Sequence, residues 1–133
     1  MNHSEQTPVD APVQDMEGFE DLTVARLLSA LGGDRELLIE IIELFLRDAP
    51  VMLRALYAAA GSGDAEALAR AAHVLKGSAA NFGTTPLYHV ARDIEHRAFA
   101  GELTGLDQRL VQLDRASGAM QRALLRLREE AAA

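Results

Sequence analysis

The chain has 133 residues, of which 49% are hydrophobic and 25% charged, a composition typical of one globular domain. It contains no cysteine, which excludes disulfides and thiolate metal sites, and no apolar run long enough for a membrane-spanning helix. The N-terminus lacks the basic start and hydrophobic stretch of a secretory signal, so we expect a cytoplasmic protein. The apolar residues are mostly Leu and Ala, which favours helices over strands.

The net charge of −7 is distributed unevenly along the chain. Residues 1–21 contain six acidic and no basic residues, whereas the rest of the chain contains 14 acidic and 13 basic residues. We predict that residues 1–20 form a disordered acidic tail and that residues 21–130 form the folded domain. Because the folded part is nearly neutral and has no basic stripe, binding to nucleic acid is not expected.

Apolar periodicity and capping residues predict a series of helices after the tail. The first covers about residues 22–31 and ends at Gly32-Gly33. Asp34 is suited to cap the second, which continues to Gly61-Ser62-Gly63. Pro50 lies inside this second helix and is expected to kink or divide it, because proline supplies no N–H and clashes with the preceding turn.

Three more helices are predicted in the second half of the chain. Asp64 is expected to cap the third, which runs to about Phe82. Thr85 and Pro86 predict the start of the fourth, and the fifth covers roughly residues 106–128, with apolar positions at three- and four-residue spacing. Because the connections are short, neighbouring helices should be antiparallel. We therefore predict an all-α fold, an up-and-down antiparallel four-helix bundle with an additional short N-terminal capping helix.

The third predicted helix carries His73, on which the functional prediction depends. On a helical wheel with about 100° per residue, the apolar residues of this helix form one stripe, and His73 lies away from it. His73 is therefore expected to face solvent, together with Lys76, Gly77 and Ala80. The stripe consists of Leu68, Ala72, Leu75, Ala79 and Phe82.

The residues around His73 suit the transfer of a phosphoryl group. A neutral imidazole is a competent nucleophile for phosphorus. Lys76, the only lysine among the 13 basic residues, lies one turn further on and can offer an ammonium group to phosphoryl oxygens. Gly77 and Ala80 carry little or no side chain, so the active site of a partner protein could approach closely. The arrangement predicts that His73 is a phosphoacceptor.

Residues 73–83, with the sequence His-Val-Leu-Lys-Gly-Ser-Ala-Ala-Asn-Phe-Gly, closely resemble the signature of histidine-containing phosphotransfer (HPt) domains. The similarity covers most of residues 22–130, including residues 44–50, 63–64 and 87–95. The resemblance implies that the chain accepts a phosphoryl group from a receiver aspartate of a hybrid histidine kinase and passes it to a response-regulator aspartate in a two-component phosphorelay. It also implies that the chain has no ATP site and binds no cofactor, because the receiver supplies the Mg²⁺.

The resemblance also implies roles for particular residues. By match, His73 would be phosphorylated on the imidazole, Lys76 would contact the phosphate, and Gly77 would permit docking of the partner. Glu95 falls where some members carry a Gln that steadies the His ring, so it is a possible ring orienter. An acidic residue there could accept a hydrogen bond from one ring N–H and leave the other nitrogen free.

Other interpretations of the same residues stay open. His73 could be an exposed helix histidine without a role, and the chain could be a non-phosphorylated helical adaptor that binds a receiver domain through the same face. It could also be a phosphorylated domain cut from a larger histidine kinase, although the chain contains no ATP-binding region and a free-standing protein is favoured. Some histidine phosphotransferases dimerise through a bundle, but this chain has enough helices to complete one alone, so a monomer is expected.

A metal site is a weaker alternative. His89, Asp93 and His96 share a helix face at the spacing i, i+4 and i+7. The chain offers no cysteine and no second helix with ligands, so ordinary surface positions are expected for these residues.

The first predicted helix is a candidate for contact with a receiver. Leu27, Leu28 and Leu31 are expected to belong to the core on one side. One or two of them are candidates for an exposed apolar rim near His73, since a receiver must dock on something besides the histidine.

Overall fold

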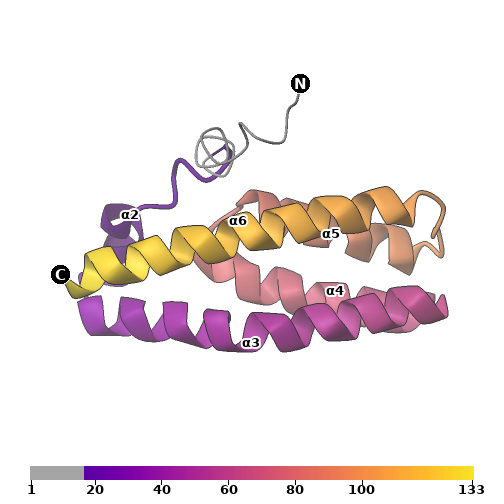
Figure 1. Cartoon of the computed structure of the whole chain (residues 1–133), viewed down its shortest axis with the longest axis horizontal. Helices are drawn as coiled ribbons and strands as arrows, with labels where there is room; N and C mark the ends of the chain where they lie inside the picture. Colours follow the sequence, from indigo (N-terminus) through magenta and orange to yellow (C-terminus); the bar gives the residue numbers. More distant parts are fainter. Residues whose placement is uncertain (1–16) are drawn as a thin grey trace, which may run out of the picture.

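The computed structural model describes residues 17–133, and this part of the chain contains five α-helices and no strand. Four helices pack side by side as a bundle, and the short α2 lies across one end (Figure 1). Each bundle helix contacts two neighbours, in the order α3, α4, α5, α6 and back to α3. The predicted all-α bundle with an extra N-terminal helix is therefore confirmed. The helices are α2 (Val24–Ala30), α3 (Arg35–Ser62), α4 (Ala65–Ala79), α5 (Pro86–Phe99) and α6 (Leu106–Ala132).

The core is one cluster of apolar side chains between the four bundle helices. Removing each large side chain of this kind from water stabilises the fold by roughly 1.5–3 kcal/mol. Phe45 of α3 meets Phe82 edge to face, with ring centroids 5.5 Å apart, and so joins α3 to the segment that follows α4. The largest fully buried side chains are Leu38, Ile42, Leu56, Leu68, Leu75, Leu87, Ile94, Leu113, Met120 and Leu124.

The connection between α3 and α4 is only Gly63 and Asp64. Gly63 adopts a left-handed conformation with φ of 69°, which ends α3 and favours glycine. The side chain of Asp64 then accepts a hydrogen bond of 3.1 Å from the backbone N–H of Ala67 and caps α4. Asp34 caps α3 in the same way, through the N–H of Leu37 at 3.0 Å. These local signals set α3 and α4 antiparallel, as predicted.

Several predicted helix boundaries need correction. Pro50 does not divide the second predicted helix, because α3 runs unbroken from Arg35 to Ser62 with Pro50 inside it. The third predicted helix ends as an α-helix at Ala79 and continues as a 3₁₀ turn over Ala80–Phe82, a common tightening at a helix end. Thr85 occupies the N-cap of α5, but its side chain makes no capping hydrogen bond.

α2 packs against α3 and α6, at the end of the bundle where α6 terminates (Figure 1). Leu27, Leu28 and Leu31 are partly buried against the core there. His73 lies instead on α4, which occupies the half of the bundle nearer the Gly63 turn (Figure 1). The α2 leucines therefore do not form the apolar rim near His73 for which they were candidates. Tertiary packing places α2 at the end of the bundle away from His73.

The predicted acidic tail lies mostly outside the described residues, which begin at residue 17. Phe19, which the prediction placed within the tail, is buried at 3% exposure, and Leu22 is buried beside it in the core. None of the helices in residues 17–133 combines the length and hydrophobicity that crossing a lipid bilayer requires.

Candidate functional site

His73 lies near the middle of α4, and its side chain is 67% exposed. The buried residues of α4 are Leu68, Ala72, Leu75 and Ala79, which form the stripe expected from the sequence. Because the buried stripe of α4 faces the core and His73 lies off this stripe, the imidazole is held at the surface, where another protein can reach it.

Glu95 of α5 holds the imidazole of His73 from the neighbouring helix. The Nδ1 atom of His73 lies 2.7 Å from Oε2 of Glu95, a short hydrogen bond between residues that are 22 positions apart. Only 18% of the Glu95 side chain is exposed, so its carboxylate is held in the groove between α4 and α5. The ring is therefore fixed through one nitrogen only.

The second oxygen of Glu95 pairs with Lys76. The ammonium nitrogen of Lys76 lies 2.8 Å from Oε1 of Glu95, and the Lys76 side chain is 22% exposed. One carboxylate thus binds the imidazole and the ammonium group at the same time. The sequence analysis predicted Lys76 only as a phosphate contact and did not predict this ion pair. The pair connects two helices, so the spacing of residues along either helix gives no indication of it.

The electrostatic state of Glu95 determines which nitrogen of His73 is reactive. Partial burial raises the pKa of Glu95, but the contacts with Lys76 and His73 lower it by more, so the pKa lies below its ordinary value of 4.5. The carboxyl group is therefore ionised at neutral pH and can only accept hydrogen bonds. Nδ1 of His73 must therefore donate the hydrogen, so that in the neutral imidazole the free lone pair is on Nε2.

Gly77 has no structural reason to be a glycine. Its φ is not positive, and a Cβ added there would meet no atom within 4 Å. Glycine in a helix interior costs roughly 0.5–1 kcal/mol relative to alanine. Gly77 and Ala80 are both exposed on the His73 side of α4, so these two positions place no bulky side chain beside the imidazole. This supports the prediction that Gly77 allows close approach of a partner.

Asp93, the carboxylate of the alternative metal site, has other partners. Asp93 forms ion pairs with Arg97 of α5 and with Arg109 of α6, and so joins these two helices. Within residues 17–133, no group of three His, Cys, Asp or Glu side chains is placed to hold a metal ion. The pairing of Asp93 with Arg109 was not found from the sequence either, because it depends on the relative level of two helices.

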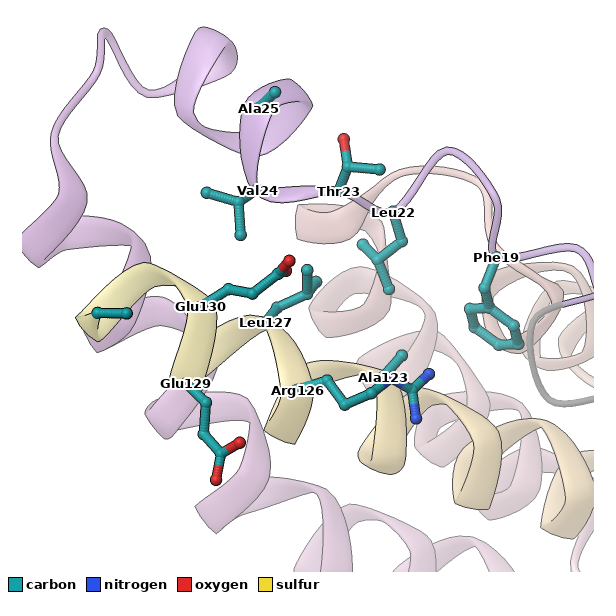
Figure 2. Close-up of a pocket in the computed structure, with 11 residues that line it drawn as sticks. Phe19, Leu22, Thr23, Val24, Ala25, Ala123, Arg126, Leu127, Glu129 and Glu130 are labelled. Atoms are coloured by element: carbon teal, nitrogen blue, oxygen red, sulfur yellow. The ribbon is translucent and has the colours of Figure 1, made fainter. Parts of the chain in front are cut away.

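One hollow of the described residues lies away from His73 (Figure 2). It has a volume of about 760 Å³ and lies between the segment before α2 and the last turns of α6. Figure 2 shows Phe19 and Leu22 from the segment before α2 and Leu127 and Glu130 from α6, while the side chain of Glu129 points away from them. His73, Lys76, Gly77 and Glu95 do not line it, and the imidazole of His73 is instead largely exposed at the surface.

The comparison with protein families agrees with this description of the surface. A family model described as "Hpt domain" matches residues 40–130, which include all of α4 and α5 and the residues His73, Lys76, Gly77 and Glu95. No curated protein and no solved structure gives a significant match to the chain.

Proposed function

The chain belongs to the Hpt domain family, and from this we propose that His73 carries a phosphoryl group between the receiver domain of a hybrid histidine kinase and that of a response regulator. Members of this family are phosphorelay intermediates rather than kinases, and they interact with receiver domains. The observation that carries the proposal is the hydrogen bond from Nδ1 of His73 to Glu95, because it selects the tautomer in which the neutral, exposed ring has its free lone pair on Nε2.

The transfer to His73 is a displacement at phosphorus. The lone pair of Nε2 attacks the phosphorus of an aspartyl phosphate on the receiver. The N–P bond forms while the bond from phosphorus to the aspartate oxygen breaks, and the aspartate leaves as a carboxylate. The ring keeps its proton on Nδ1 and gains a positive charge, which the carboxylate of Glu95 offsets across 2.7 Å.

The onward transfer reverses these changes. A carboxylate oxygen of the second receiver attacks the phosphorus, the N–P bond breaks, and the electron pair returns to Nε2. The retained proton on Nδ1 makes the neutral imidazole the leaving group, so no separate acid is needed. Glu95 therefore keeps the ring in one tautomer through both steps.

Lys76 supplies positive charge next to the phosphorylated ring. It lies one turn after His73, and its ammonium group is already held at the site by Oε1 of Glu95. A phosphoryl group on Nε2 would compete with Glu95 for this ammonium group, because charged phosphoryl oxygens are strong acceptors. The Mg²⁺ that neutralises the remaining charge belongs to the receiver in this proposal.

The direct test is labelling of the purified chain by a phosphorylated receiver domain. We expect an acid-labile, base-stable adduct that His73→Gln abolishes. ATP and Mg²⁺ alone should leave the chain unlabelled, and label appearing there would overturn the assignment as an intermediate without kinase activity. Persistence of the adduct in His73→Gln would overturn the assignment of His73.

The alternative function is a helical adaptor that binds a receiver without accepting a phosphoryl group. The lone pair on an exposed Nε2 and the unexplained glycine at position 77 favour transfer, since neither is needed for binding alone. An adaptor would bind a receiver equally well after His73→Gln and would never take up label.

A further inference from the structure

Seven large apolar side chains of the described residues are exposed, on all four bundle helices, and three of them, Phe99, Val74 and Val51, lie around His73. Phe99 is 87% exposed, the highest value among the large apolar residues of the described chain, and Val51 and Val74 follow at 57% and 54%, with Val111 at 55%. A phenylalanine exposed to this degree contributes little to the fold, and clusters of such residues mark sites of protein contact.

Phe99 lies on the side of His73 that faces α5. It follows Glu95 by four residues on α5, which places it about 6 Å further along the same helix face. Because Glu95 binds His73 directly, Phe99 lies about one turn from the imidazole. α5 runs antiparallel to α4, so Phe99 lies toward the N-terminal half of α4.

Val74 lies on the opposite side of His73. Lys76 faces α5, since it pairs with Glu95, and Val74 is two residues away, about 160° around the helix. Val51 of α3 is at the same level: it precedes Gly63 by 12 residues and Val74 follows Gly63 by 11, and the two helices are antiparallel around that glycine. Val51 and Val74 thus form the α3 side of the same surface.

We propose that Phe99, Val74 and Val51 are the apolar contacts on which a receiver domain docks when it exchanges a phosphoryl group with His73. This inference rests on the proposed function. A receiver domain fits this surface by position, because any protein whose aspartate reaches Nε2 of His73 must cover the surface immediately around the ring. Members of the family interact with receiver domains, so a receiver is the partner that fits this position.

The charges on this face fit the same partner. Arg70 and Arg92 are exposed on α4 and α5 on either side of the imidazole level, and Lys76 lies between them. An aspartyl phosphate on the partner is negatively charged, so cations around the histidine complement it. The apolar side chains would supply the buried contact and the cations would orient the encounter.

The test compares two phosphodonors on the same variants. A phosphorylated receiver domain that labels the wild-type chain must dock, whereas phosphoramidate, a small donor that releases ammonia when Nε2 attacks its phosphorus, need not. With the receiver, we expect Phe99→Ala to raise the concentration for half-maximal rate about tenfold and Val74→Ala several-fold, with the maximal rate little changed. With phosphoramidate, both variants should label at the wild-type rate.

Val111→Ala is the matched control. Val111 has nearly the same exposure as Val74 but lies on α6, which packs against α3 and α5 and is diagonally across the bundle from α4. It should not change either reaction. A second measurement, binding of the unphosphorylated receiver to His73→Gln with and without Phe99→Ala, reports docking without chemistry and should show the same weakening.

The outcomes separate the two claims. If the receiver labels Phe99→Ala and Val74→Ala with wild-type concentration dependence, the docking surface is wrong and the relay function stands. If neither any receiver nor phosphoramidate labels His73 in the wild-type chain, the proposed function is wrong and the docking inference falls with it.

Discussion

Nδ1 of His73 and Oε2 of Glu95 are 2.7 Å apart, and this contact joins α4 to α5 at the surface of the bundle. It selects the tautomer of the ring, because an ionised carboxylate can only accept. The same carboxylate holds Lys76 at 2.8 Å. Glu95 therefore connects the other two polar groups of the site, although in the proposed function it is His73 that is phosphorylated.

Replacing Glu95 should separate its hydrogen bond from its charge. We expect Glu95→Ala to slow labelling of His73 by phosphoramidate about tenfold, because the ring loses both its orientation and the charge that offsets the phosphorylated imidazole. Glu95→Gln keeps an acceptor for Nδ1 and should lose only part of the rate. Initial labelling rates at one donor concentration measure both effects. An unchanged rate in Glu95→Ala would show that the hydrogen bond has no role in reactivity.

The lowered pKa of Glu95 predicts a pH-dependent contribution to folding stability. A carboxyl group whose pKa is lower in the folded than in the unfolded state stabilises the fold at pH values above its unfolded pKa. This stabilisation is lost as the pH falls through the lower pKa of the folded state. Wild type should therefore exceed Glu95→Gln by up to about 1 kcal/mol near neutral pH, and the difference should vanish in strong acid. Urea unfolding at a series of pH values measures it.

Glu66→Gln is the control for this comparison. Glu66 is 88% exposed and lies 3.8 Å from Arg70, so its removal should change stability little at any pH. A difference between wild type and Glu95→Gln that grows as the pH falls below 4.5 would contradict the lowered pKa of Glu95.

Gly77 gives a prediction in which stability and function move in opposite directions. Gly77→Ala should raise the free energy of unfolding by roughly 0.5–1 kcal/mol, because the helix gains a better former and no atom lies within 4 Å of the new Cβ. Gly77→Leu should keep the fold but reduce transfer from a receiver at least about tenfold, through steric exclusion. Labelling by phosphoramidate should change much less.

Gly61 provides the matched position for Gly77. It also lies in a helix with nothing within 4 Å of an added Cβ, but it belongs to the last turn of α3. Gly61→Leu should leave receiver transfer unchanged. Equal loss in the two leucine variants would mean that access to His73 is not the reason for Gly77.

Lys76 should show energetic coupling to Glu95. Lys76→Ala removes the cation nearest the phosphoryl group, and we expect the rate of transfer to fall about tenfold. Lys76→Arg keeps the charge but not the compact ammonium group, so it should recover only part of the rate. In the double variant Lys76→Ala with Glu95→Gln, the losses should not add, because each single change disrupts the same ion pair. Additive losses would indicate that the two residues act independently.

Features that depend on residues close together in the sequence were predicted well. Asp34, Asp64 and Gly63 act through backbone groups a few residues away, so both ends of α3 and the start of α4 followed from residue type. The exposure of His73 followed from the position of Leu68, Ala72 and Leu75 on the same helix, since periodicity determines which face is buried.

Features that depend on how helices sit against one another were not predictable in this way. The contact of Lys76 with Glu95 requires α4 and α5 to be at a particular level. The position of α2 depends on its packing with α3 and α6, and this is why its leucines were placed wrongly near His73. Pro50 remained inside a continuous helix, because packing along both sides of α3 outweighs the loss of one backbone hydrogen bond.

The hydrogen bond between His73 and Glu95 spans only 22 residues, on two consecutive helices. Closing such a short stretch of chain has a small entropy cost, and local contacts of this kind form early in folding. The reactive arrangement thus depends on the α4–α5 pair more than on the distant ends of the chain. Substitutions in α2 or at the end of α6 should change how many molecules are folded, while each folded molecule keeps the same reactivity at His73.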